Sequence, residues 1–315
     1  MPEKVYSKIH SKKKWKGRMR HIGVDLHQNS FTAAYQNASR NVWLEEYELK
    51  RVKEFKKKLR REDEVVVKAA GNTRYFVDEI EGCVKKIVVV DPNRFEVTRK
   101  SVKKTDKKDA RRLAVYLSKD MIPEARLKER GQAQIHSQVQ TRDRLVKLRT
   151  VLMNKLHNIC NGYGIKIKIK KESLGSKVGL KRVEKLPLDK TVKIEVEVVR
   201  EQIRSLNSGI HKLEEELKGR GSGLDGFASL KSIKGIEEKS AAALLSVIGD
   251  IKDFAGEDKL AAYFGIVPRV HNSNETEHHG RITKRGTEIG RTTLVQWALI
   301  AKKYNLYLQK FYERI

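Results

Sequence analysis

The chain of 315 residues carries 68 Lys and Arg against 40 Asp and Glu, a formal net charge of +28. Hydrophobic residues make up 39%, which is enough for a folded core and excludes disorder throughout, and the length is typical of roughly two domains. No apolar run approaches the ~18 residues of a membrane-spanning helix, and the basic first residues lack the apolar segment of a secretory leader. Cys83 and Cys160 are too few for a disulfide scaffold, which favours a cytoplasmic location. The excess of positive charge predicts a polyanionic partner, most simply nucleic acid.

Residues 1–20 are basic and weakly patterned, with eight Lys and Arg among them. A segment of this kind is either an arm that becomes ordered on a nucleic acid or a solvated tail. The sequence leaves both interpretations open.

The next hundred residues alternate between short apolar runs and short amphipathic segments. The runs that predict strands are residues 21–26, 30–35, 42–49, 64–69 and 86–90. The segments that predict helices are residues 51–59, 73–80 and 105–117. The order β-β-β-α-β-α-β-α is typical of a ribonuclease-H-like domain, in which a meander and covering helices build a mixed sheet.

Two long helices with heptad spacing are predicted next. Apolar residues recur three and four apart in each: Leu145, Leu148, Leu152, Leu156 and Ile159 in the first, and Val199, Ile203, Leu206, Ile210, Leu213 and Leu217 in the second. Between them, residues 161–190 contain nine Lys and Arg, three acids and no consistent pattern. We expect an antiparallel coiled-coil hairpin that also mediates oligomerisation; an ordinary helical linker is the alternative.

The remaining segment is predicted to be mostly helical. After a Gly-rich break at 219–226, residues 230–250 fit a helix-hairpin-helix whose turn at Gly235 offers backbone N–H groups to a phosphate. A plain helical turn is the alternative, since Gly commonly ends helices. A helix around 258–264, an irregular loop at 268–281 and a last helix at 290–304 follow.

Three carboxylates stand where phosphoryl-transfer chemistry could use them. Asp25 lies near the end of the first predicted strand, where a buried carboxylate is costly unless it is paired or bound to a metal ion. Asp106 and Asp109 are three apart and share one face of a predicted helix. Each pattern alone is also typical of a turn or a helix cap. In a ribonuclease-H-like order, such carboxylates converge and can hold two Mg²⁺ ions about 4 Å apart, which clamp the attacking and leaving oxygens.

Six motifs resemble those of one transposase family. They are Gly23-Val24-Asp25, Ala70-Gly71-Asn72, Lys104 to Ala110 (KTDKKDA), Lys234-Gly235-Ile236, Phe264 to Arg269 (FGIVPR) and His271 to Gly286 (HNSNETEHHGRITKRG). Through them the chain resembles the IS-one-ten family of insertion-sequence transposases, which is related to Piv-type DNA invertases. The last two motifs, in this order and spacing, are the most specific.

The resemblance implies four regions: a basic arm at 1–20, a RuvC-like domain with an Asp-Glu-Asp-Asp metal site at 21–124, a coiled-coil hairpin at 125–219 and a serine transposase domain at 220–315. The metal ligands fall on Asp25, Asp106 and Asp109, with Mg²⁺ or Mn²⁺ as the cofactor. The nucleophile falls on Ser273, which would hold a DNA strand as a phosphoserine and so conserve the phosphodiester energy. Without the resemblance, a serine in this polar loop is an ordinary turn residue.

The implied partners are double-stranded donor and target DNA, a structured bridge RNA that pairs with both, and further copies of the chain in a dimer or tetramer. Base pairing would then supply the specificity. No membrane partner is expected, and the location would be a prokaryotic cytoplasm, on the nucleoid. Four cations that follow Ser273 would bind phosphate or serve as solubilising charge: Arg281, Lys284, Arg285 and Arg291. The nearby His271, His278 and His279 match no metal-site spacing.

Position 68 departs most from the family pattern, because a Lys stands where the metal-binding Glu belongs. Glu64 is four residues earlier, ~13 Å away along the strand, so it cannot replace the missing metal ligand. Three interpretations follow: a site of three carboxylates and water, a catalytically impaired or engineered relative that binds nucleic acid, or a Lys68 ammonium group in the place of one metal ion. We favour impaired catalysis. Asn274 in place of Gly is a mild departure, and the family implies a further helical segment beyond Ile315.

The sequence therefore leaves three alternative functions open. The first is an RNA-guided DNA recombinase or transposase. The second is a RuvC-like, structure-selective nuclease with water as the nucleophile. The third is a nucleic-acid-binding module without catalysis, which predicts tight, salt-dependent binding and no cleavage.

Overall fold

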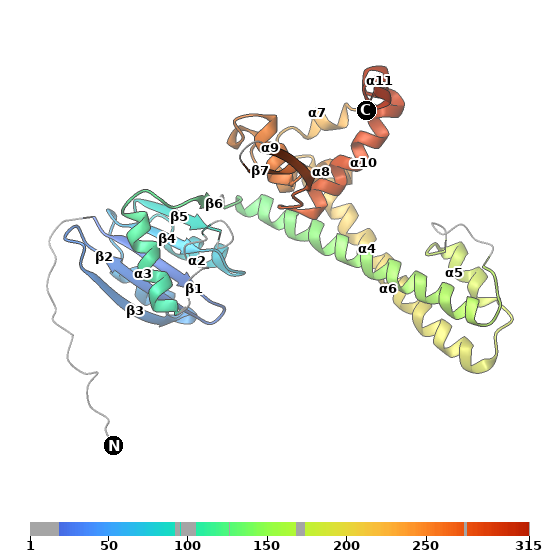
Figure 1. Cartoon of the computed structure of the whole chain (residues 1–315). Coiled ribbons are helices and arrows are strands. Elements are labelled where there is room, and N and C mark those ends of the chain that lie inside the picture. Colours follow the sequence, from blue (N-terminus) through green and yellow to red (C-terminus); the bar gives the residue numbers. More distant parts are fainter. Residues whose placement is uncertain are drawn as a thin grey trace. The chain divides into compact units, whose positions relative to one another are not determined.

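The computed structural model describes residues 19–91, 95, 105–125, 127–167, 174–273 and 276–314 (Figure 1). Most of the predicted basic arm, the segment that contains Lys104 and part of the basic hairpin loop lie outside these residues. The chain divides into two compact units, of which the first ends at Leu127 and the second begins at Lys128.

The first unit is built on a six-stranded mixed sheet. Its strands are β1 (His21–Leu26), β2 (Ser30–Gln36), β3 (Val42–Glu48), β4 (Glu64–Lys68), β5 (Lys86–Val90) and β6 (Glu124–Ala125). Their order is β3-β2-β1-β4-β5-β6; β1 to β3 form an antiparallel meander, and β4 and β5 run parallel to β1. This arrangement is compatible with the predicted ribonuclease-H-like fold. The two residues of β6 were too few to give a pattern in the sequence.

Helices cover both faces of this sheet, and strand alternation decides which residues meet which helix (Figure 1). The helices are α1 (Val52–Lys58), which follows the 3-10 turn η1 (Leu49–Arg51), α2 (Thr73–Ile80) and α3 (Asp106–Leu117). On one face, Ile22 and Val24 of β1 share a core with Phe55 of α1 and Phe76 of α2. On the other face, Val66 packs with residues of α3. Because neighbours alternate, Asp25 and Lys68 point to the α3 face.

Gly23 lets α3 approach β1 backbone to backbone. A Cβ atom at this position would lie 2.2 Å from the carbonyl oxygen of Ala110 and 2.4 Å from the amide nitrogen of Ala114. Only a glycine leaves room for the helix at this distance. The approach also brings the first turn of α3 close to the end of β1.

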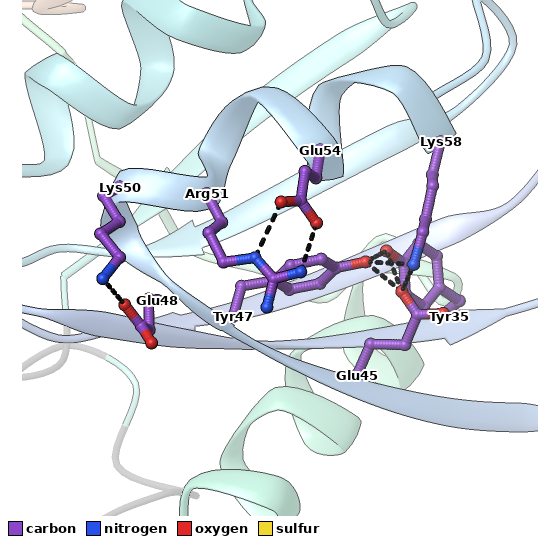
Figure 2. Close-up of polar contacts among 8 residues, drawn as sticks. All are labelled: Tyr35, Glu45, Tyr47, Glu48, Lys50, Arg51, Glu54 and Lys58. Atoms are coloured by element: carbon purple, nitrogen blue, oxygen red, sulfur yellow. Dashed lines mark hydrogen bonds and ion pairs between the residues drawn. The ribbon is translucent and has the colours of Figure 1, made fainter.

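A partly buried polar network joins β2, β3 and α1 (Figure 2). The Lys58 ammonium group lies 2.8 Å from Glu45 Oε2 and 2.9 Å from Tyr47 Oη, and Tyr35 Oη donates to Glu45 Oε2 over 3.2 Å. Burial raises the pKa of Tyr35 and the pKa of Tyr47. Both phenols therefore stay protonated, and each buried oxygen has a partner. The network fixes α1 on its face of the sheet.

An ion pair closes the end of the sheet where β1 and β4 begin. The Arg20 guanidinium binds both carboxylate oxygens of Asp63, with 2.9 Å from Nε to Oδ1 and 2.5 Å from Nη2 to Oδ2. Both side chains are buried, and the amide of Arg60 also donates to Asp63 Oδ2 over 2.8 Å. This fork geometry is the strongest form of an Arg–carboxylate contact.

The second unit begins with two long antiparallel helices, α4 (Arg130–Gly162) and α6 (Lys190–Gly221), which pack side by side (Figure 1). The predicted unpatterned loop between them is partly wrong, because it contains α5 (Lys177–Glu184). Leu174, Leu180 and Leu188 are buried there against the long helices. The many Lys residues between these leucines hid the apolar face in the sequence. The long helices do not hold an apolar stretch that could span a bilayer, and neither does any other helix in the described part of the chain.

The rest of the second unit combines helices with a β-hairpin. Its elements are α7 (Phe227–Lys231), α8 (Glu238–Ile248), the 3-10 turn η4 (Ile251–Asp253), α9 (Glu257–Phe264), β7 (Pro268–Ser273), β8 (Thr276–Ile282), α10 (Glu288–Tyr304) and α11 (Leu306–Arg314). The prediction of an irregular loop at 268–281 is wrong, because β7 and β8 pair in antiparallel register with an irregularity between Pro268 and Val270. Most residues in the sequences of these two strands are polar, so no apolar alternation marked them.

Candidate functional site

The three carboxylates selected from the sequence come together at one end of the sheet. Val24 of β1 pairs with Val67 of β4, so Asp25 and Lys68 follow side by side as the next residues of two parallel strands. Asp106 and Asp109 lie in the first turn of α3, where the helix dipole favours negative charge. The side chains of Asp25 and Asp109 are only 1% and 2% exposed. Buried carboxylates require a cation, and the sequence supplies one.

That cation is the Lys68 ammonium group. Its Nζ lies 3.0 Å from Asp25 Oδ1 and 3.2 Å from Asp109 Oδ2, and it donates a hydrogen bond to Asp109. Burial by itself would lower the pKa of Lys68, but the two carboxylates outweigh it and raise that pKa above its ordinary value. Burial raises the pKa of Asp25, and the adjacent Lys68 opposes this rise. Lys68 is therefore charged at neutral pH and bridges two buried carboxylates.

His27 completes a second cluster on the other side of Asp25. Its Nε2 lies 3.5 Å from Asp25 Oδ2 and 3.3 Å from Asp106 Oδ2. The ligand atoms of Asp25, His27 and Asp106 all lie within 4.8 Å of one another, as one metal ion requires. Sequence reasoning missed His27; its signal was the position two residues after Asp25, which places both on the same side of an extended chain.

The donor set fits one divalent ion and does not fit a pair. Asp25 Oδ2 is buried and accepts no hydrogen bond from the residues that the structure describes, so it is free to bind a cation beside His27 and Asp106. The space between Asp25 and Asp109, which a second ion would need, holds the Lys68 ammonium group. When bound, a divalent ion there would act as a Lewis acid on a phosphate oxygen.

The acids at the start of β4 do not reach this cluster. Glu64 begins β4 and binds the Lys85 ammonium group at 2.7 Å, while the carboxylate of Asp63 is held by Arg20. Both lie at the opposite end of the strand from Lys68. Neither replaces the carboxylate that the family pattern places at position 68.

Ser273 is the last residue of β7, and it pairs with Thr276 across the end of the hairpin. It belongs to the second unit. The side chains of Ser273, His271, His278 and His279 lie outside the described part of the structure. The assignment of Ser273 as the nucleophile remains a prediction from the family resemblance.

Three of the four cations after the hairpin are exposed: Arg281 at the end of β8, and Lys284 and Arg285 in the following loop. The loop is held close to α9, because the amide of Lys284 donates to the carbonyl oxygen of Gly265 over 3.0 Å. Arg291 is partly buried, and its Nη1 donates to the Phe264 carbonyl oxygen over 3.0 Å. The first three side chains can reach a phosphate, whereas Arg291 joins α10 to α9.

Gly235 lies in the turn between α7 and α8 with a φ of +94°, a conformation that glycine adopts without strain. One side of its Cα packs on α10, since a Cβ there would lie 2.3 Å from Ile300 Cγ2. Gly235 itself is exposed, as a backbone contact with phosphate requires.

Comparison with known proteins relates both parts of the chain to one kind of protein. The IS110-type DEDD transposase model matches residues 22–165, and the model described as "Transposase IS116/IS110/IS902 family" matches residues 228–313. The chain is 27% identical over 235 residues to the transposase for insertion sequence element IS1111A of Coxiella burnetii, a region that covers 74% of this chain and 64% of that relative.

A second relative is similar to the same extent. The chain is 26% identical over 239 residues to a probable family 20 transposase of Pseudomonas aeruginosa, and this region covers 74% of this chain and 70% of that relative. The chain therefore spans about two-thirds of the length of these relatives. Together, the two matched regions include the acidic cluster at the end of β1, the hairpin of β7 and β8 with Ser273 at the end of β7, and the cations that follow it. The chain belongs to the IS110 family of insertion-sequence transposases.

Proposed function

We propose that this chain is a DNA transposase that cuts and rejoins strands at the ends of an insertion sequence, with a RuvC-like domain and a nucleophilic serine. The observation that carries the proposal is the meeting of Asp25, Asp106 and Asp109 at one end of a sheet with ribonuclease-H-like strand order. Carboxylates in this arrangement orient a phosphate and its nucleophile through a divalent cation.

In the proposed reaction, the Ser273 hydroxyl attacks a DNA phosphorus atom and forms a phosphoserine, while the bond to the neighbouring sugar oxygen breaks and that oxygen takes up a proton. A sugar hydroxyl of the exchanging strand then attacks the phosphoserine, forms the new phosphodiester and returns the serine. One ester is exchanged for another in each step, so no ATP is needed. Arg281, Lys284 and Arg285 are exposed beyond the hairpin and would hold the phosphates.

We also propose that a structured RNA guides the protein to donor and target DNA, and that the active assembly is a dimer or tetramer. The net charge of +28 is spread over the N-terminal segment, the region of α3, the loop between the long helices and the cations after Ser273. A spread of this kind suits a protein that holds one RNA and two DNA duplexes. RNA that co-purifies with the protein and has two guide loops would support guidance, and only random RNA would oppose it.

The serine assignment is tested by trapping a covalent protein–DNA adduct after denaturation. Ser273→Ala should abolish the adduct, whereas Ser205→Ala, which changes an exposed serine on α6, should leave it unchanged. If the Ser273→Ala protein still forms the adduct, the assignment is wrong. Metal-dependent cleavage without any adduct would instead indicate the nuclease, with water as the nucleophile.

A second candidate function is a relative that binds nucleic acid but cuts it poorly. The observation that favours it is the Lys68 ammonium group, which occupies the space between Asp25 and Asp109. We expect Lys68→Glu to cleave DNA faster with Mg²⁺ than the natural chain does. Equal cleavage rates would refute impaired catalysis, and tight, salt-dependent binding without cleavage under any metal would support it.

A further inference from the structure

We propose that the Lys68 ammonium group permanently replaces one of two divalent ions, and that the chain binds a single divalent cation on Asp25, His27 and Asp106. This inference concerns the same site as the proposed function and rests on it for the role of the bound ion. It assigns His27 as a metal ligand and Lys68 as the positioning residue for Asp25 and Asp109.

The position of Lys68 supports the replacement. Its Nζ contacts one carboxylate oxygen on each of two residues, at 3.0 Å from Asp25 and 3.2 Å from Asp109, as an ion shared by both carboxylates would. The Lys68 side chain is 17% exposed, so the contact is largely shielded from water. Two carboxylates buried this deeply would repel each other without a cation between them. The chain carries that cation itself, and a metal ion is not needed to assemble this half of the site.

The charges of the cluster agree with one ion. Three carboxylates and one ammonium group leave two negative charges, which a single divalent cation neutralises. A Glu at position 68 would add a carboxylate and remove the ammonium group. Four negative charges would then remain, and two divalent cations would be needed. The residue at position 68 therefore sets the number of ions.

The geometry on the other side of Asp25 is that of a metal site. An octahedral ion with ligands at about 2.1 Å places adjacent ligand atoms about 3 Å apart. His27 Nε2 lies 3.5 Å from Asp25 Oδ2 and 3.3 Å from Asp106 Oδ2, close to this spacing. Asp25 Oδ2 accepts no hydrogen bond from the described residues, although its side chain is 99% buried. A buried carboxylate oxygen in this state lacks a partner that a cation would supply.

The test counts bound Mn²⁺ by isothermal titration calorimetry on the full chain without DNA. We expect one ion for the natural protein and two for Lys68→Glu. Lys53→Glu, the same charge reversal at an exposed position on α1, should still bind one ion. His27→Ala should weaken the binding of the single ion at least ~10-fold, the loss expected for a ligand or its orienting partner. Two ions or none on the natural protein, or an unchanged affinity in His27→Ala, would overturn the proposal.

A second variant covers the case in which Lys68→Glu does not fold without metal. Lys68→Met keeps the length of the side chain and removes its charge. We expect its melting temperature in EDTA to fall below that of the natural chain, and Mn²⁺ to restore part of the loss. A melting temperature in EDTA equal to the natural one would overturn the role of the ammonium group. The ion count does not depend on strand transfer, so its failure leaves the Ser273 proposal intact, and a failed Ser273 test leaves the count intact.

Discussion

Gly23 offers a direct way to separate the acidic cluster without changing any of its residues. In Gly23→Ala, the new Cβ would lie 2.2 Å from the Ala110 carbonyl oxygen and 2.4 Å from the Ala114 amide nitrogen. Ordinary van der Waals contact begins near 3.4 Å, so α3 must retreat by about 1.2 Å. The obstacles are backbone atoms of a helix and cannot rotate aside. We therefore expect a loss of about 3 kcal/mol, the upper part of the usual range for overpacking.

The displacement should also reach the site. Asp109 is adjacent to Ala110, so it moves with the helix, and its 3.2 Å contact with Lys68 should lengthen beyond about 4 Å. Hydrogen exchange of β1 and β4 peptides across a urea series, measured by mass spectrometry on the full chain, reports the stability of the first unit alone. A weaker affinity for Mn²⁺ should accompany the shift in the urea midpoint.

Gly71→Ala is the matched control, because nothing lies within 4 Å of a Cβ at that position. It should leave the midpoint unchanged or raise the stability by up to about 1 kcal/mol, since the added methyl group restricts the unfolded chain. The reasoning is refuted if Gly23→Ala and Gly71→Ala unfold at the same urea concentration.

Buried groups elsewhere in the chain give three more expectations. Asp63→Ala leaves the guanidinium group of Arg20 buried without a counter-ion, so it should lower the free energy of unfolding of the first unit by about 3–5 kcal/mol. The control Glu62→Ala, at an exposed position, should change this free energy by no more than about 0.5 kcal/mol. Equal urea midpoints of the two variants would contradict the ion pair. Leu156→Ala removes a fully buried side chain of α4 and should lower the stability of this helix, measured by hydrogen exchange, by about 2–5 kcal/mol. Leu148→Ala, at a position that is 53% exposed, should lower it far less. The reverse order would be inconsistent with the packing of α4. Burial lowers the pKa of His136 to about 4 from an ordinary value of 6.5, so the unfolded chain binds the proton more readily. The contribution of His136 to stability is complete above pH 6.5 and is lost as the pH falls towards about 4. His136→Gln should therefore make the melting temperature depend less on pH in this range. An unchanged slope would show that the imidazole of His136 does not cause the pH dependence.

The sequence predicts the first unit well because its strands are half-buried or fully buried and its helices are amphipathic. The three carboxylates could be selected because their strand order and spacing imply convergence. The contacts of Lys68 with Asp25 and Asp109 could not be predicted, because they depend on how closely β1, β4 and α3 approach one another in the folded protein. His27 stands two residues after Asp25, but this spacing is common in extended chains, and only its contacts with Asp25 and Asp106 in the folded protein single it out.

The second unit was harder to predict for two physical reasons. The sequences of β7 and β8 are mostly polar, so the two-residue apolar period that marks a strand is missing. In α5, the apolar face spans only two turns and stands within a run of lysines. Ser273 could be selected only through the family resemblance, because a serine at the end of a polar hairpin has no chemical signature of its own.

The position of Lys68 also has a genetic consequence. Glutamate and lysine codons differ only in their first base, so one G-to-A transition converts the four-carboxylate arrangement of the family pattern into this one, and the reverse transition restores it. The β4 strand keeps its buried valines in either case. A gene copy that carries Lys68 therefore keeps the buried valines of β4 and lies a single base change from the carboxylate-rich arrangement, so the charge of this site can be reversed in one step without rebuilding the sheet around it.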